Sequence, residues 1–254
     1  MQLVDAHCHF DFPCFDDGRD GVLTRASAGG VKRLVIPGVR QPDWSRGRDL
    51  AAQVEGIDYC LGIHPWFIAE HGPESLAELE LALRTWSPAP VALGECGLDR
   101  LKGALAEQLP WFEQQVDLAQ NLALPLVVHS VRSHDEVAAV LARKRVNVPV
   151  LVHGFAGSYQ QASRLVALGC YLGVGGVITY DRARKTRDAL ARVPVESLVL
   201  ETDAPDMPPA GIRPGNNSPE QLPSILSALA ALRPESEAEL AGQIWTNTAR
   251  LYGW

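Results

Sequence analysis

The chain has 254 residues, a formal net charge of −7 at pH 7 and 46% hydrophobic residues. This length suits one domain with a large core, and the acidic balance excludes a general electrostatic attraction to nucleic acid. No apolar run is long enough to span a membrane, and the five scattered cysteines form no CxxC pair. The N-terminal residues lack the pattern of a secretory leader, so we expect a cytoplasmic protein.

Eight short apolar runs recur along the chain, separated by longer amphipathic stretches. Runs that are apolar at nearly every position are typical of strands buried on both faces of a parallel sheet. Eight β–α alternations in this length predict a single-domain α/β fold over residues 1–254, a (β/α)8 TIM barrel rather than a doubly wound sheet. The predicted strands cover residues 2–9, 32–39, 58–64, 91–96, 124–130, 148–154, 170–178 and 197–203.

Helical patterns follow several of these runs. Ser133 with Glu136 three residues later predicts a capping box, and Ser158 predicts another helix start. The Pro-rich residues 203–219 predict a long loop after the last strand. The predicted helices cover residues 107–122, 133–145, 158–169, 218–232 and 236–253.

Histidines and carboxylates fall at one end of the predicted strands. A TIM barrel builds its active site at the C-terminal ends of its strands, so these side chains are expected to converge on one mouth of the barrel. The residues at the ends of the first, third, fourth, fifth, sixth and eighth runs are His7 and His9, His64, Glu95, His129, His153 and Asp203.

Each of these residues, taken alone, has a structural alternative. His7 and His9 in "VDAHCHF" would share one face of a strand and could chelate a metal ion, or could be two hydrogen-bonded core histidines. Glu95 could be one half of a buried ion pair. Glu201 and Asp203 are also two residues apart and would share one face of a strand, where the two carboxylates would repel each other without a nearby cation. Their convergence favours metal binding.

The number of candidate ligands predicts two divalent metal ions per chain, because a catalytic zinc usually takes only three protein ligands. We expect one ion on His7, His9 and Asp203, the other on His129 and His153, and Glu95 between them. Paired ions activate water in hydrolytic reactions, and Asp203 is then the candidate general base. The mixed nitrogen and oxygen ligands suit Zn, Mn, Co or Ni, and Mg less well.

The motifs, in order, are "VDAHCHF", "GIHP", "GECGLD", "LPLVVHS", "HGFAGS", "LGCYLGVGG" and "LVLETDAP". Across essentially the whole chain they resemble the TatD family of metal-dependent deoxyribonucleases, which are amidohydrolase-like (β/α)8 hydrolases; the opening "DAHCHFDFP" is similar to the YjjV-like branch. The resemblance implies a two-metal phosphodiesterase acting on DNA ends, with the same six metal ligands. It also implies a substrate phosphate contact for His64 and a catalytic role for Glu201 in the "ETD" motif, beside Glu95 and Asp203.

Several positions depart from the family pattern, and they concern the substrate rather than the metals. Val131 stands where the family usually has an arginine, and Arg132 follows; Arg132 could contact phosphate from this shifted position or be a solvated cation. Arg100 in "GLDR" stands where the family has an aromatic residue, and "NSP" (residues 217–219) stands where it has "NEP". Apart from these departures, Asn217 could bind a phosphate or organise a turn. Trp66 could stack on a base or pack over the barrel rim.

The sequence therefore predicts a hydrolase with a binuclear metal centre that acts on DNA as an exonuclease-type phosphodiesterase. The alternative is an amidohydrolase-type enzyme that uses the same centre on a small amide, ester or lactone, which the acidic charge and Val131 favour. A non-catalytic metal-binding protein is the third possibility. We expect DNA or another phosphodiester or small-molecule substrate as the partner, no membrane, no obligate protein partner, and a monomer.

Overall fold

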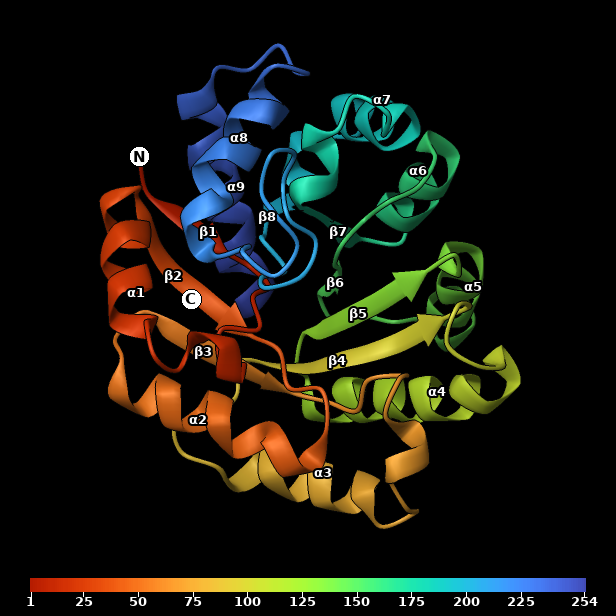
Figure 1. Cartoon of the computed structure of the whole chain (residues 1–254). Coiled ribbons are helices and arrows are strands. Elements are labelled where there is room, and N and C mark those ends of the chain that lie inside the picture. Colours follow the sequence, from red (N-terminus) through yellow and green to blue (C-terminus); the bar gives the residue numbers. More distant parts are fainter.

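Eight parallel strands pair in chain order into one sheet that curls into a barrel, with helices around its outside (Figure 1). The computed structural model describes residues 1–254. The strands are β1 (Leu3–Asp5), β2 (Val31–Ile36), β3 (Ile57–Leu61), β4 (Ala92–Asp99), β5 (Leu126–Val131), β6 (Val150–Val152), β7 (Cys170–Val174) and β8 (Leu198–Leu200). The predicted (β/α)8 TIM barrel is confirmed.

Hydrogen bonds between the chain after β1 and the chain around β8 close the barrel. The Ala6 N–H donates to the Leu200 carbonyl at 2.8 Å, and the Asp203 N–H donates to the His7 carbonyl at 2.9 Å. The second bond lies just beyond the two strands, at the C-terminal end of the barrel, which we call the mouth. The closing seam therefore brings His7 and Asp203 side by side although 196 residues separate them in the chain.

Helices alternate with the strands and turn their apolar residues towards the sheet. In α4, Phe112, Val116 and Ala119 recur at helical spacing and are fully buried, and each buried Val or Phe stabilises the fold by about 1.5–3 kcal/mol. The helices are α1 (Arg19–Ala28), α2 (Trp44–Gln53), α3 (Ser75–Thr85), α4 (Leu105–Leu122), α5 (His134–Lys144), α6 (Tyr159–Ala167), α7 (Arg184–Arg192), α8 (Leu222–Ala230) and α9 (Glu237–Tyr252). None of them combines the length and the hydrophobicity that crossing a membrane requires.

The barrel interior is filled by small and medium apolar side chains, so it offers no channel. Leu251 and Tyr252 at the end of α9 pack against these residues, and Trp254 lies on Arg33 near the start of β2. The C-terminal helix thus plugs the end opposite the mouth, and a site can form only at the mouth. The strand residues in this inner cluster are Ala6, Val35, Cys60, Ala92, Val127, Leu151 and Val199.

Several predicted strands extend too far at their C-terminal ends. The first was predicted over 2–9 but β1 ends at Asp5, and the last was predicted over 197–203 but β8 ends at Leu200. His7, His9, Glu201 and Asp203 therefore lie in irregular backbone. Asp203 has a φ of 54°, a conformation that cannot continue a strand.

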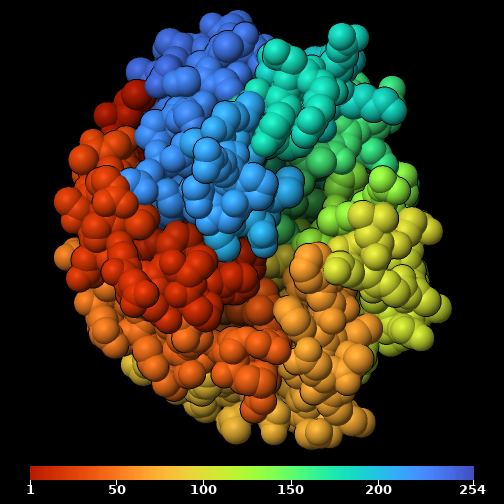
Figure 2. Space-filling view, in the orientation of Figure 1, coloured from red at the N-terminus to blue at the C-terminus, as the bar shows by residue number.

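The long loop between β8 and α8 forms part of the rim of the mouth. Figure 2 shows this loop in light blue next to the red N-terminal segment, bordering a hollow in the surface. Arg25 of α1 forms an ion pair with Glu220 at the end of the loop, which joins the two segments.

One of the two predicted helix caps is wrong. Ser133 precedes α5, but its hydroxyl donates to the Leu98 carbonyl at 2.8 Å instead of capping the helix, and Glu136 pairs with Arg100. Ser158 does cap α6, in a capping box with Gln161. The hydroxyl of Ser133 is therefore used to join α5 to β4.

Asp5 joins the two sides of the closing seam, and we expect its replacement to change how stability depends on pH. Its carboxylate accepts from the Thr202 N–H at 2.9 Å and from the Thr202 hydroxyl. Burial raises the pKa of Asp5 from 3.8 to about 7 although these hydrogen bonds oppose it. The folded chain then binds more protons than the unfolded chain between pH 4 and 7, so this carboxyl makes stability fall as pH rises through that window.

Asp5→Asn should remove this dependence, because the amide does not titrate. Relative to wild type, the variant should gain roughly 4 kcal/mol or less between pH 4.5 and 7.5. Urea unfolding of both proteins at several pH values, with chelator present, measures the difference. A difference that stays constant across this range would contradict the prediction.

Candidate metal centre

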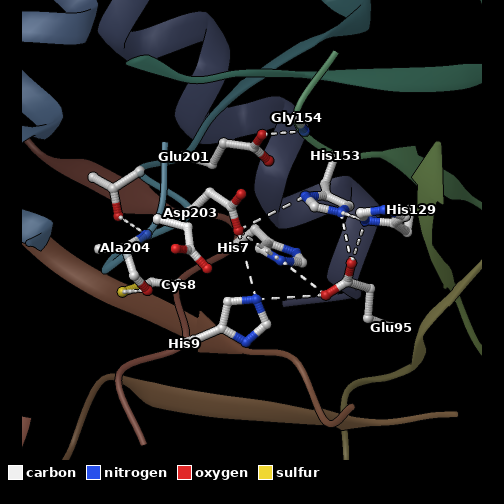
Figure 3. A network of polar contacts seen from close by, with 12 residues as sticks. His7, Cys8, His9, Glu95, His129, His153, Gly154, Glu201, Asp203 and Ala204 are labelled. Atoms are coloured by element: carbon white, nitrogen blue, oxygen red, sulfur yellow. Dashed lines mark hydrogen bonds and ion pairs between the residues drawn. The ribbon is translucent and has the colours of Figure 1, made fainter. Parts of the chain in front are cut away.

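Six side chains converge at the mouth, and we call them the His–carboxylate cluster. Glu95 lies in the middle, and its two carboxylate oxygens face different histidine pairs (Figure 3). Oε2 lies 3.3 Å from His7 Nε2 and 3.5 Å from His9 Nε2, while Oε1 lies 2.9 Å from His129 Nδ1 and 2.7 Å from His153 Nε2. The cluster consists of His7, His9, Glu95, His129, His153 and Asp203, all buried.

Asp203 completes the half of the cluster around His7 and His9. Its Oδ1 lies 3.3 Å from His7 Nε2 and 3.5 Å from His9 Nε2, like the Oε2 of Glu95. Ligands at 2.0–2.2 Å from a tetrahedral ion are about 3.3–3.6 Å apart, and these four imidazole–carboxylate distances lie in that range. The groups with metal-ligand spacing here are His7 with His9 and Glu95, and His7 with His153 and Asp203. His7 Nε2 and Glu95 Oε2 are also buried without any hydrogen-bond partner. The donor set therefore fits a metal ion.

The other half of the cluster is more tightly spaced. His129 Nδ1 and His153 Nε2 are 3.1 Å apart, and both lie close to Glu95 Oε1. The rings of His153 and His7 stack with centroids 3.9 Å apart, which fixes one half of the cluster against the other. Three overlapping groups in this region have the ligand spacing that a metal ion requires, and one of them includes His64 with Glu95 and His129.

A bulge in β4 carries Glu95 into the mouth. The pairing of β4 with β5 is regular at Leu93 and again at Cys96, with an irregularity between them. Gly94 and Gly97 flank the bulge with φ angles of 151° and 139°. A Cβ on Gly94 would collide with Val127, and one on Gly97 would collide with the backbone of His129. The "GECG" sequence thus lets the two strands approach closely around the carboxylate.

Burial and hydrogen bonding set opposite protonation states within the cluster. Burial alone would raise the pKa of Glu95, but the surrounding imidazoles of His153, His64 and His7 hold it well below its usual range. Burial lowers the pKa of His153 to about 4. Burial would also lower that of His129, yet hydrogen bonds to Asp99 and Glu95 raise its pKa to about 9. Glu95 is therefore ionised and His153 neutral, as metal ligands must be.

His64, predicted as a substrate contact, lies against the cluster rather than away from it. The Trp66 N–H donates to His64 Nδ1 at 3.2 Å, which leaves the proton on Nε2. That Nε2 lies 3.1 Å from Glu95 Oε1. His64 therefore presents an N–H donor beside the central carboxylate, and burial lowers its pKa and keeps it neutral.

Asp99 is a site residue that the sequence interpretation missed. Its Oδ2 lies 3.2 Å from His129 Nε2 and accepts from the Trp66 indole N–H at 2.6 Å. Accepting the Nε2 proton leaves the Nδ1 of His129 free to face Glu95, which is how a carboxylate orients a metal-binding histidine. Burial would raise the pKa of Asp99, but His129 and Trp66 lower it to about 2. Trp66, half-exposed at the rim, is thereby connected to the cluster.

Asp99→Asn should weaken metal binding without removing a ligand. The amide no longer favours the His129 tautomer with a free Nδ1, and a loss of about 10- to 100-fold in metal affinity is expected. Titration of chelator-treated protein with Zn²⁺ measures the affinity. Asp20→Asn, an exposed aspartate of α1 in no ion pair, is the control. Unchanged affinity in Asp99→Asn would contradict the orienting role.

Glu201 does not join Asp203 in facing the histidines. Its Oε1 accepts a hydrogen bond from the Gly154 N–H, and Figure 3 shows its carboxylate turned away towards that residue. Gly173 of β7 leaves the space that the carboxylate occupies. Burial raises the pKa of Glu201 to about 8, so it is protonated at neutral pH. Its position supports the backbone next to His153 rather than a direct contact with substrate.

Arg132 and Asn217, both predicted substrate contacts, lie outside the cluster. Asn217 is buried, its Nδ2 donates to the Thr202 carbonyl at 2.8 Å, and its Oδ1 accepts from the Ser218 N–H. These hydrogen bonds organise the β8–α8 loop and occupy both the NH2 group and the oxygen of the Asn217 side-chain amide. Arg132 is exposed, has a φ of 51°, and lines a neighbouring cleft.

Comparison with known proteins gives the family. Residues 4–253 match the family model described as "TatD related DNase". The chain belongs to the TatD family. Family membership and the buried ligand clusters together place it among the metal-dependent hydrolases.

Relatives of this TatD-family chain include proteins with two kinds of description. The Escherichia coli (strain K12) protein described as "uncharacterized metal-dependent hydrolase YjjV" is 41% identical over 99% of this chain and 98% of its own length. The "3'-5' ssDNA/RNA exonuclease TatD" of Klebsiella pneumoniae (strain 342) is 32% identical over 94% of this chain and 93% of its own length.

Solved structures of TatD homologues agree with the fold. The crystal structure of YjjV from Escherichia coli K12 superimposes with a TM-score of 0.95 at 41% identity, covering 99% of this chain and 98% of that protein. A TatD-family hydrolase from Entamoeba histolytica superimposes with a TM-score of 0.87 at 20% identity, covering 99% of this chain and 98% of the other, which supports the barrel fold alone.

Proposed function

We propose that the His–carboxylate cluster binds two divalent metal ions and hydrolyses phosphodiester bonds of nucleic acid. The observation that carries the proposal is that the two oxygens of Glu95 face different histidine pairs. One ion would be held by His7, His9 and Asp203 and the other by His129 and His153, with Glu95 common to both. The ligand types suit Zn, Mn, Co or Ni, and Mg less well.

Two such ions supply Lewis acidity at a phosphoryl oxygen and make a nearby water molecule easier to deprotonate. Asp203 is the carboxylate placed to accept that proton, because its side chain is 12% exposed whereas that of Glu95 is 2% exposed. Burial alone would raise its pKa, but the neighbouring imidazoles of His7 and His9 lower it, so it is ionised and able to act as a general base.

His64 and Glu201 are proposed to assist in different ways. The Nε2–H of His64 points at the edge of the cluster and can donate to a substrate oxygen that lies beside Glu95. Glu201 holds the Gly154 N–H and so fixes the backbone that follows His153. We assign Glu201 a positioning role, and the direct chemistry to Asp203 and Glu95.

The proposed substrate class is supported by the relatives described as ssDNA/RNA exonucleases. One observation favours the alternative, an amidohydrolase-type reaction on a small amide, ester or lactone: the residue two positions after His129 is the apolar Val131 and not a cation. Four of the five cysteine thiols are buried and none forms a disulfide, which supports a reducing compartment such as the cytoplasm. We also propose that the protein is a monomer.

Chelator-treated protein supplied with Zn, Mn, Co, Ni or Mg should hydrolyse end-labelled single-stranded DNA or RNA. The same preparations are assayed on a panel of esters, lactones and amides. A Glu95→Gln variant purified in parallel controls for contaminating nucleases. Turnover of a small amide, lactone or carboxylic ester with no cleavage of any nucleic acid would select the alternative, and no metal-dependent turnover at all would reject both.

A further inference from the structure

A cleft of about 770 Å³ lies beside the cluster, at the starts of α5, α6 and α7. These helices are neighbours around one side of the barrel (Figure 1). The cleft is almost entirely polar and includes Arg132, Arg164 and Lys185 together with Ser158 and Gln160. We call it the mouth cleft. None of the six cluster residues lines it, so it is a separate surface on the same face.

The mouth cleft is close to the cluster along the chain. Arg132 follows His129 by three residues, and their Cα atoms are therefore at most about 11 Å apart. Gly157 and Ser158 follow His153 by four and five residues. A chain-like substrate with one group at the cluster would pass the cleft with its next few groups.

Cations without carboxylate partners gather on this face of an otherwise acidic protein. Most Lys and Arg side chains of the protein form ion pairs. The exceptions are mainly in the loops that follow β4, β5, β7 and β8 and in the first turn of α7. In the mouth cleft, Arg132 and Lys185 form none, and Arg164 shares Asp135 with Gln161. The cations at the mouth that form no ion pair are Lys102, Arg132, Arg182, Arg184, Lys185 and Arg213. Three further cations form no ion pair but lie away from the mouth, namely Lys32, Arg145 and Arg250.

The start of α6 adds backbone donors to these charges. Ser158, Gln160 and Gln161 at this helix start line the mouth cleft, and the capping box uses only the N–H groups of Ser158 and Gln161. Helix N-termini favour anions because the unpaired N–H groups and the helix dipole act together. Fixed donors and flexible cations around one polar cleft suit a ligand with several anionic groups, such as successive phosphates.

We propose that the mouth cleft binds the non-scissile phosphates of a single-stranded nucleic acid whose end lies at the cluster. This inference rests on the proposed phosphodiesterase function and extends it. Because the Cα of Arg132 is at most about 11 Å from that of His129, its guanidinium can reach the phosphates next to the scissile one. A small ester or amide has no charges at these distances and would not use the cleft.

The triple substitution Arg132→Gln, Arg164→Gln and Lys185→Gln tests the mouth cleft. The matched control replaces Lys32, Arg145 and Arg250 with Gln, because these cations are also exposed and unpaired, and the net charge changes equally. Each set contains one arginine with positive φ, Arg132 or Arg145, so backbone strain is also matched.

Binding is measured by fluorescence anisotropy with labelled oligothymidylate, with chelator present to prevent cleavage. The cleft triple should bind about tenfold or more weakly at low salt. Its slope of log affinity against log salt should become shallower by about 2, since each lost single-strand contact removes about 0.7. The control triple should keep the wild-type slope. Equal losses in both triples, or no oligonucleotide binding by wild type, would overturn the proposal.

A small diester separates this inference from the function on which it rests. Bis(p-nitrophenyl) phosphate has one diester and cannot reach the mouth cleft. Metal-dependent hydrolysis of this compound by wild type, with unaltered oligonucleotide binding by the cleft triple, would overturn the cleft and leave the proposed function standing. Failure to hydrolyse any phosphodiester, with cleft-dependent oligonucleotide binding, would overturn the phosphodiesterase function alone.

Discussion

Glu95→Gln should lower kcat/KM by about 10³-fold or more, the largest effect expected from any single substitution in this protein. Oε2 of Glu95 faces two histidines and Oε1 faces three, and both halves of the cluster depend on the negative charge of this carboxylate. Glutamine keeps one oxygen and the shape of the side chain, but its NH2 group is a donor that cannot ligate a cation. The variant should therefore bind about one ion or none where wild type binds two.

Metal analysis after equilibration with excess Zn²⁺ and dialysis, together with circular dichroism, measures the two halves of this prediction. The fold should persist because Glu95 has no ion pair outside the histidines around it. Glu78→Gln is the matched control, since that glutamate is exposed on α3 and forms no ion pair. Retention of two ions or of wild-type activity in Glu95→Gln would refute the central position given to this carboxylate.

The barrel and the six cluster residues were predictable from the sequence for a specific physical reason. Strands buried on both faces must be apolar almost throughout, so a histidine or carboxylate at the end of such a run is conspicuous. His129 and His153 are two such residues, and each follows an apolar run at the C-terminal end of the neighbouring strands β5 and β6. The convergence of these ends is then a property of the fold itself.

The role of Asp99 was not predictable in this way. The fourth run was taken to end at Cys96, whereas β4 continues to Asp99 after the bulge at Glu95. Local sequence gives no sign that the bulge turns Asp99 towards His129 on the next strand. The bond from Trp66 to Asp99 likewise depends on the path of the loop after β3, which only the folded chain defines.

The direction of side chains beyond the strand ends was also not predictable from the sequence. Glu201 and Asp203 were expected on one face of a strand, but β8 ends before them and Asp203 has a positive φ. The two carboxylates therefore separate, one towards Gly154 and the other towards His7. Helix α1 gave little signal for a different reason, since only Ala26 is buried and its sequence lacks a clear apolar face.

Removal of bound metal should lower the melting temperature by about 5–11 °C. An ion present at about 100 times its Kd stabilises the folded state by about 2.7 kcal/mol, and each kcal/mol shifts Tm by about 2–4 °C in a domain of this size. The structural reason is that the cluster buries candidate ligand atoms with no hydrogen-bond partner, namely His7 Nε2 and Glu95 Oε2. Without an ion, the folded chain retains the cost of desolvating these atoms.

Differential scanning calorimetry of chelator-treated protein, with and without added Zn²⁺ or Mn²⁺, measures the shift at one fixed pH. Glu95→Gln should show a much smaller shift than wild type, because the stabilisation requires the shared carboxylate. Lower pH should reduce the shift in wild type, since protons compete with the ion for His7. Equal melting temperatures with and without metal, at metal concentrations that restore activity, would contradict this prediction. The ions would then bind without offsetting the desolvation of the buried ligand atoms, and the close approach of His7 to Asp203 would need another explanation.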